Sequence, residues 1–246
     1  MRSVRRFVAV SCVLAAVVLG AGACGSTDPD AGALSGKSAS QVLSSTLALV
    51  QHMGAFHFLD ETTGNGPTVG IVGDAGTLVG QQTISGNGPP VQVRVYDQVA
   101  YVDGSADVLA GLLGLSAATA ADNAGKWISV GPSDPHYASI AHAVTFNAVL
   151  APFIPTGRLT LGGVTTLQGR RVLAVTGSAR AADGGGAPGT ATLYVSVAAP
   201  NLPAGATLVL TNGSQQQHEA AAFTEWGEVV APSTPRGAIP LSSLTS

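Results

Sequence analysis

Charged residues are scarce in this chain of 246 residues, where they make up 10% of the sequence, against about 25% in a typical soluble domain. Mean hydropathy is +0.34. These values exclude a disordered chain, which needs low hydrophobicity and high charge, and an ordinary coiled coil rich in glutamate and lysine. The 11 basic and 14 acidic residues give a net charge of −3. The sequence therefore predicts no interaction with nucleic acid, which requires a basic surface.

Cysteine is nearly absent, because the chain contains two cysteines, Cys12 and Cys24. This number excludes a disulfide framework. It also excludes a structural zinc site built on cysteine in the chain after residue 24. The G-x-S-x-G motif of the α/β-hydrolases does not occur either, so that class of enzyme has no support.

A glycine-rich stretch at 184–189 formally matches the G-x-G-x-x-G pattern of dinucleotide sites. In those sites the glycine turn opens a helix whose N-terminus binds the pyrophosphate. Here the residues after the turn alternate as in a strand, and Pro188 interrupts the glycines. We interpret residues 183–189 as a hairpin loop.

Histidines and carboxylates form no recognisable metal or catalytic set. His52 and His57 are five residues apart and His136 and His142 are six apart, whereas a helical metal pair needs a spacing of three or four. The carboxylates that could form an acid/base pair are Asp60, Glu61, Asp103 and Asp107. Lone carboxylates near turns usually serve solubility, so we expect no catalytic residues, no metal site and no cofactor.

The N-terminus resembles a bacterial lipoprotein leader. Three arginines in the first six residues precede an apolar run at 7–19, which is too short for a bilayer span of about 20 residues. Small residues then lead directly to Cys24, as in a lipobox, although Ala21 stands where leucine is usual. We predict a signal peptide over 1–23 and lipid attachment at Cys24. The alternative is a plain signal peptide cut after Ala23, which leaves an exported protein without an anchor.

Residues 24–246 are acidic, so we expect them to stay on a membrane only through the lipid on Cys24. Loss of residues 1–23 removes three basic residues and no acidic ones, which gives a net charge of −6. Stable anchoring takes two acyl chains, which modification of Cys24 can supply. Residues 24–37 are small and polar, and we expect a flexible tether there. Residues 38–246 are predicted to form one domain that faces the periplasm from the cell membrane.

The first part of this domain predicts one helix and a meander of strands. Apolar residues recur at helical spacing over 38–53, where a serine can cap the start and Gly54 can end the helix. Valine alternates with polar residues over 91–96, and 99–102 follows as its hairpin partner. Short strands separated by glycine turns indicate an antiparallel sheet.

The second part predicts two helices and a return to strands. We expect the helices over 107–115 and 137–153, and the second is apolar on two faces, which predicts burial on both sides. Alternating apolar residues resume over 191–197, and 223–226 is expected to be the last strand before a proline-rich tail. The fold class is therefore predicted to be α+β, with a strongly curved antiparallel sheet and helices on its concave side.

Several segments together resemble the mycobacterial cell-envelope lipoproteins that include LppX and LprG. They are Cys24, the helix start at 37–43, the first strand at 56–58, the hairpin at 91–102 and the closing segment at 223–227. The resemblance covers roughly residues 37–246 and rests on layout rather than on one motif. Residues 201–205 and the low charge depart from the family pattern. The resemblance implies a LolA-like half-barrel sheet packed around helices, with an apolar cavity that carries lipid between membranes.

The resemblance and the lack of a catalytic set predict a non-enzymatic carrier of lipid or glycolipid with long acyl chains. It would transfer lipid across the envelope, with envelope transport proteins as candidate partners. The residues expected to line the cavity are Val93, Val95, Leu112, Ile140, Val144, Leu193 and Val195. The alternative is an envelope lipoprotein that binds a protein partner and carries no lipid. Cavity volume distinguishes the two, because a carrier needs well above the ~300–1,000 Å³ of a drug-sized pocket.

Overall fold

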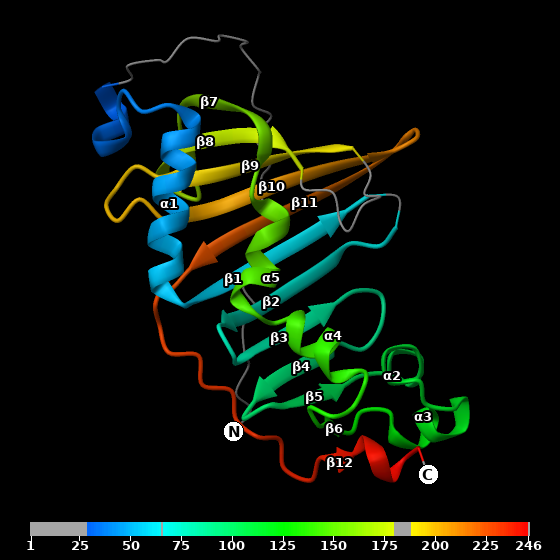
Figure 1. Ribbon diagram of the computed structural model, residues 1–246. Coiled ribbons are helices and arrows are strands. Elements are labelled where there is room, and N and C mark those ends of the chain that lie inside the picture. Colours follow the sequence, from blue (N-terminus) through cyan, green and yellow to red (C-terminus); the bar gives the residue numbers. More distant parts are fainter. Residues whose placement is uncertain (1–28, 65, 180–187, 246) are drawn as a thin grey trace, which may run out of the picture.

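A computed structural model describes residues 29–64, 66–179 and 188–245, which form one open sheet of 12 strands with helices (Figure 1). The strands are β1 (Ala55–Thr63), β2 (Val69–Gly76), β3 (Gly80–Ser85), β4 (Val91–Tyr96), β5 (Val99–Asp103), β6 (Ile128–Val130), β7 (Thr156–Leu167), β8 (Arg170–Ser178), β9 (Gly189–Ser196), β10 (Pro203–Asn212), β11 (Gln215–Thr224) and β12 (Ile239–Pro240). Their order across the sheet is β12-β6-β5-β4-β3-β2-β1-β11-β10-β9-β8-β7.

The α-helices are α1 (Ala39–Met53), α2 (Ala106–Leu113), α3 (Ala117–Asn123), α4 (Tyr137–His142) and α5 (Phe146–Leu150). The short 3-10 helices are η1 (Pro29–Leu34), η2 (Ala151–Phe153) and η3 (Leu241–Ser243). Within the described residues, no helix combines the length and apolarity that crossing a membrane requires. The predicted signal peptide at 1–23 and the predicted lipidation site Cys24 lie outside the described residues.

The sheet is curved and does not close, since β7 and β12 remain as its two edges. Its strand pairings are antiparallel except for β12 with β6, which is parallel. Figure 1 shows α1 and α5 lying over the same face of this sheet. The prediction of an α+β fold with a curved antiparallel half-barrel sheet and helices on its concave side is confirmed.

Helix α1 forms where the sequence predicts a helix over 38–53, and its ends follow local signals. The Ser38 side chain accepts a hydrogen bond from the Gln41 amide, and the Gln41 side chain accepts one from the Ser38 amide. This capping box satisfies amides that a helix start leaves without partners. Gly54 ends the helix in the left-handed conformation, with φ 69°.

The single helix predicted over 137–153 is wrong, because the chain forms α4, α5 and η2 there. The helix breaks because the backbone at Val144 approaches the sheet closely. The backbone of Val144 lies directly against Gly80, so that a Cβ atom at Gly80 would overlap the Val144 carbonyl oxygen. Thr145 then bridges to Gly76 and has an extended backbone. An extended residue interrupts the helical hydrogen bonds, and the second helix has to start again after it.

Buried apolar side chains form two clusters, one along each half of the sheet. The large cluster contains residues of η1, α1, α5 and η2 with β1, β2 and β8 to β11. The small cluster contains residues of α2, α3, α4 and η3 with β4 to β6. The segment α4–α5–η2 crosses from the small cluster to the large one, since Ile140 and Val144 belong to the former and Phe146, Leu150 and Phe153 to the latter.

Both ends of the described chain differ from the expectation. Ala31 and Leu34 of η1 are buried in the large cluster, so the folded body begins within 24–37, the segment predicted to be a tether. Strand β11 ends at Thr224, before the end of the segment predicted to be the last strand. The chain then crosses to the opposite edge, where β12 pairs with β6. On the way, the Arg94 side chain donates a hydrogen bond to the Ser233 carbonyl oxygen, 3.1 Å away.

Candidate functional site

Alternation along the central strands separates a buried concave face from an exposed convex face. On β1 and β11, Phe58 pairs with Phe223, and both side chains are buried. On β1 and β2, Leu59 pairs with Val72, and these side chains are 46% and 45% exposed. We call the surface that carries Phe58 and Phe223 the concave face, because their cluster also contains residues of α1 and α5.

An aromatic cluster fills one end of the concave face. Phe56 lies at its centre, with ring centroids 5.2 Å from Phe146, 5.5 Å from Phe223 and 4.8 Å from Trp226. The indole nitrogen of Trp226 donates a hydrogen bond of 2.9 Å to the Pro203 carbonyl oxygen, which satisfies its polar atom inside an apolar site. These rings join α5 to β1 and β11, and the partly buried Trp226 packs against the large cluster.

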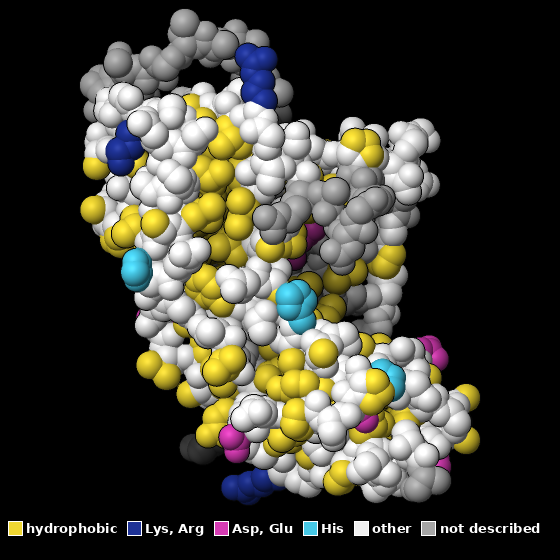
Figure 2. Space-filling model, in the orientation of Figure 1, with side chains coloured by type: hydrophobic (Ala, Val, Ile, Leu, Met, Phe, Trp, Pro, Cys, Tyr) yellow, Lys and Arg dark blue, Asp and Glu magenta, His cyan; other side chains and the backbone are white. Residues whose placement is uncertain are grey.

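Half-buried apolar side chains continue from this cluster. They include Leu47 of α1, Val149 of α5, Ile154, and Leu159 and Leu161 of β7, all packed against the large cluster. Figure 2 shows hydrophobic side chains gathered on the face between α1 and α5. We call this surface the apolar strip. The strip gathers partly buried apolar side chains on one face. The most exposed large apolar side chains lie outside it, at Leu59, Val72, Leu78, Tyr96 and Val229.

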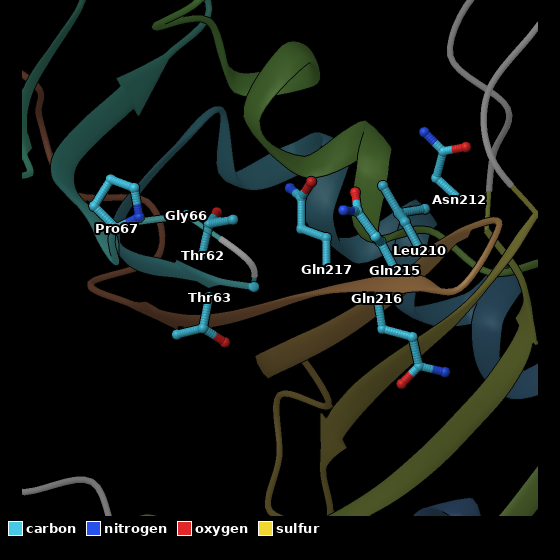
Figure 3. A pocket seen from close by; sticks show the side chains of 10 residues that line it. Thr62, Thr63, Gly66, Pro67, Leu210, Asn212, Gln215, Gln216 and Gln217 are labelled. Atoms are coloured by element: carbon cyan, nitrogen blue, oxygen red, sulfur yellow. The ribbon is translucent and has the colours of Figure 1, made fainter.

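A polar pocket of about 420 Å³ lies at the C-terminal end of β1 (Figure 3). Its lining comes from the end of β1, the turn after it and the β10–β11 hairpin. The lining residues are Thr62, Thr63, Gly64, Gly66, Pro67, Leu210, Asn212, Gln215, Gln216 and Gln217. These side chains offer hydroxyl and amide groups and carry no charge. Leu210 also packs against the large cluster, so the pocket adjoins apolar surface.

Between the aromatic cluster and the polar pocket lie two carboxyl groups, those of Asp60 on β1 and Glu219 on β11. The strand register places Thr62 opposite Glu219 and Asp60 opposite Ala221, so the two carboxyl groups are diagonal neighbours on one face. Burial, and secondarily the charge and hydrogen bond of Glu219, raise the pKa of Asp60 to about 8. Burial also raises the pKa of Glu219. The Oδ1 atom of Asp60 is buried without a hydrogen-bond partner among the described residues.

Substitution of Asp60 by asparagine is expected to stabilise the protein at alkaline pH. Because the pKa of Asp60 is raised from 3.8 to about 8, the folded state keeps a proton that the unfolded state loses. The free energy of unfolding therefore falls as pH rises from about 4 to about 8. One group contributes at most ~1.4 kcal/mol per pH unit, and partial solvent exposure reduces this. We expect Asp60→Asn to gain about 1–2 kcal/mol at pH 8 in urea unfolding.

The matched control for this experiment is Glu61→Gln, which removes the neighbouring carboxylate from the exposed side of β1. It should leave the pH dependence of stability as in the parent. Equal slopes between pH 5 and pH 8 for the parent and Asp60→Asn would contradict the raised pKa of Asp60.

The seven residues predicted to line a cavity divide between the two clusters. Val93, Val95, Ile140 and Val144 belong to the small cluster, and Leu112 packs against it. Leu193 and Val195 belong to the large cluster. All except Leu112 are at most 4% exposed, so they lie within packed core rather than around the polar pocket. Their role in binding lipid stays a prediction.

Sequence reasoning missed the pairing of Asp60 with Glu219, because the two residues come from opposite ends of the chain. Asp60 was a candidate carboxylate, but the proposed partners were Glu61, Asp103 and Asp107. Strand register was the missing information, since β1 pairs with β11. The glycine motif at 184–189 lies outside the described residues except for Pro188 and the last glycine, which begins β9.

Comparisons with known proteins identify the fold. Neither a protein-family model nor a curated protein sequence matches the chain. The solved structure of LprF from Mycobacterium bovis has a TM-score of 0.53 at 17% identity, over 81% of this chain and 97% of LprF. The lipoprotein LppX of Mycobacterium tuberculosis has a TM-score of 0.51 at 17% identity, over 78% of this chain and 98% of LppX. The chain therefore has the fold of LprF and LppX, as its resemblance to the LppX and LprG lipoproteins predicted.

Proposed function

We propose that the protein is a cell-envelope lipoprotein that binds acyl-chain lipids on its concave face and transfers them across the envelope. The observation that carries this proposal is the apolar strip between α1 and α5, together with the uncharged polar pocket on the same half of the sheet. A lipid has the same two parts, apolar chains and a polar head. The fold shared with LprF and LppX supports this role. The proposal assigns no catalytic residue.

Apolar burial is the main contribution expected to hold such a ligand. Each buried methylene contributes about 0.8 kcal/mol, so ten methylenes contribute about 8 kcal/mol before the cost of association is subtracted. The strip therefore needs no charged residue to bind an acyl chain. The hydroxyl and amide groups of the pocket would hydrogen-bond the polar head.

Entry of acyl chains requires space that the packed clusters do not offer, so we infer that α4, α5 and η2 move together. These helices are short, and none of them has a side-chain hydrogen bond at its N-cap. Segments of this kind open at lower free energy than the whole protein unfolds. Their displacement would expose Ile140 and Val144 on the moving segment and Leu193 and Val195 on β9 of the sheet. These predicted lining residues would then be able to contact the ligand.

Native mass spectrometry of the purified protein, combined with lipid extraction, tests the proposal. We expect co-purified lipid in the parent and at least a tenfold loss of it in Val149→Trp, because a bulky ring on α5 would fill part of the apolar strip. Val72→Trp is the matched control, since it makes the same change on the convex face. That variant should retain its lipid.

Absence of lipid from a folded parent protein would contradict the carrier function. It would favour an envelope lipoprotein that binds a protein partner through the apolar strip. The two packed clusters of the described residues favour this second function, since a partner-binding protein has a filled core and an exposed apolar patch.

A further inference from the structure

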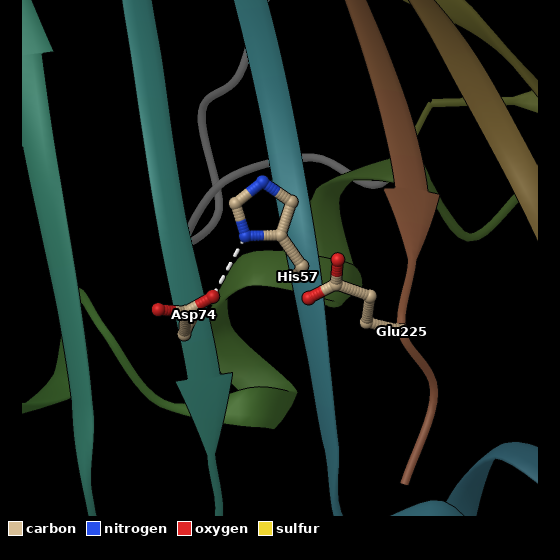
Figure 4. Close-up of side chains that lie close together, drawn as sticks. All are labelled: His57, Asp74 and Glu225. Atoms are coloured by element: carbon tan, nitrogen blue, oxygen red, sulfur yellow. Dashed lines mark hydrogen bonds and ion pairs between the residues drawn. The ribbon is translucent and has the colours of Figure 1, made fainter. Parts of the chain in front are cut away.

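Three potential metal ligands meet on the convex face, away from the apolar strip. His57 lies on β1, Asp74 on β2, and Glu225 directly follows β11 (Figure 4). The register pairs His57 with Asp74 on one side and with Thr224 on the other. One ligand atom from each of the three side chains lies within 4.8 Å of the other two. Three adjacent segments of the central sheet therefore contribute one ligand each.

The Asp74 carboxylate is held between two neighbours. Its Oδ1 atom is 2.7 Å from Nδ1 of His57, and its Oδ2 atom accepts a hydrogen bond of 2.7 Å from the Gln81 side chain. Gln81 lies opposite Asp74 in the pairing of β2 with β3. Such a bond to the free oxygen of a liganding carboxylate is the usual support around a metal site, where it fixes the direction of the ligand.

Glu225 completes the set from the opposite side of His57. Figure 4 shows its carboxylate directed toward the His57 side chain. The backbone of Glu225 has φ 53°, a left-handed conformation that is uncommon for residues other than glycine. A pocket of about 200 Å³ also opens beside His57, Asp74 and Gln81. It offers room for water molecules next to His57 and Asp74.

We propose that His57, Asp74 and Glu225 bind a divalent transition metal ion such as Zn²⁺. Imidazole nitrogen and carboxylate oxygens are ligands of Zn²⁺, at about 2.0–2.2 Å. The ion replaces the hydrogen bond between Nδ1 of His57 and Oδ1 of Asp74. It binds Nδ1 of the neutral imidazole, whose single proton then lies on Nε2. Glu225 is exposed, so its side chain can rotate the short distance needed. Water fills the fourth position.

The spacing of histidines along the chain predicts no metal site, because that spacing detects only pairs of ligands on one helix. His57 and Asp74 lie on strands and Glu225 directly follows one, so the ligands meet across the sheet rather than along the chain. A bound ion would fasten the end of β11 to β1 and β2. The proposal does not depend on lipid binding, since the convex face is separate from the apolar strip.

Calorimetric titration of the purified, tag-free protein with ZnCl₂ tests the site. We expect one ion per chain, and at least tenfold weaker binding in both His57→Gln and Glu225→Gln. The melting temperature of the parent should rise with Zn²⁺ and that of the two variants should not, because a ligand of the folded state stabilises it. The matched control is His136→Gln. His136 has a similar contact of 2.9 Å with Asp134 but no third ligand among the described residues.

The control should bind Zn²⁺ as the parent does. Lack of binding by the parent would overturn the proposal, as would full binding by Glu225→Gln, or equal loss in His136→Gln. Glu225→Gln decides the question if His57→Gln does not fold, because Glu225 is exposed and its substitution leaves the strand pairing intact.

Discussion

Replacement of Phe56 by alanine is expected to lower the free energy of unfolding by about 3–5 kcal/mol, measured by urea denaturation. Phe56 is 1% exposed, and its ring contacts Phe58, Phe146, Phe223 and Trp226. Truncation removes buried apolar area and leaves a cavity that rings on three different elements cannot all close.

The comparison for this variant is Tyr96→Ala, which removes an aromatic ring that is 43% exposed. Exposed substitutions of this kind usually change stability by about 0.5 kcal/mol or less. Similar losses of unfolding free energy for the two variants would mean that the aromatic cluster contributes no more to stability than an exposed ring does.

Replacement of Cys24 by alanine is expected to move most of the protein from the membrane fraction into the soluble fraction of cell extracts. The acidic chain that follows the predicted leader has no electrostatic attraction to an anionic membrane, so lipid on Cys24 is the predicted anchor. Stable anchoring takes two acyl chains, and their loss removes nearly all of the membrane affinity.

Cys12→Ala is the control for this experiment, because it changes the other cysteine within the predicted leader. It should leave the protein in the membrane fraction. If Cys24→Ala remains on the membrane to the same degree as Cys12→Ala, the lipobox interpretation is wrong.

Local elements could be predicted because their signals lie close together in the sequence. Ser38 and Gln41 form the capping box of α1 within one turn. The alternating valines of β4 lead into Asp97 and Gln98, whose positive φ angles of 50° and 59° form the two-residue turn to β5. Each of these features depends on neighbours along the chain, so no knowledge of the tertiary fold was needed.

Features that depend on distant contacts could not be predicted in the same way. The break before α5 arises because Val144 rests on Gly80, and no glycine or proline occurs between residues 137 and 151 to mark it. The Asp60–Glu219 pair and the His57–Asp74–Glu225 cluster depend on which strands are neighbours. Leu34 lies in a polar stretch, and its burial follows from contacts with the large cluster. Local patterns along the chain indicated the class of fold, whereas the strand register determines which side chains meet.

The order of the strands has a consequence for how the chain acquires its structure. Strands β1 to β6 pair with successive neighbours, and so do β7 to β11. The pairing of β1 with β11 joins these two runs, and it brings residue 57 beside residue 224. Pairings between successive strands form fast because the loops that they close are short. The pairing of β1 with β11 forms more slowly, because it closes a loop of more than half of the chain. Until it forms, β1 and β11 are open edges, and β1 of one molecule can pair with β11 of another. Domain-swapped dimers exchanged at this seam are the expected form of misassembly.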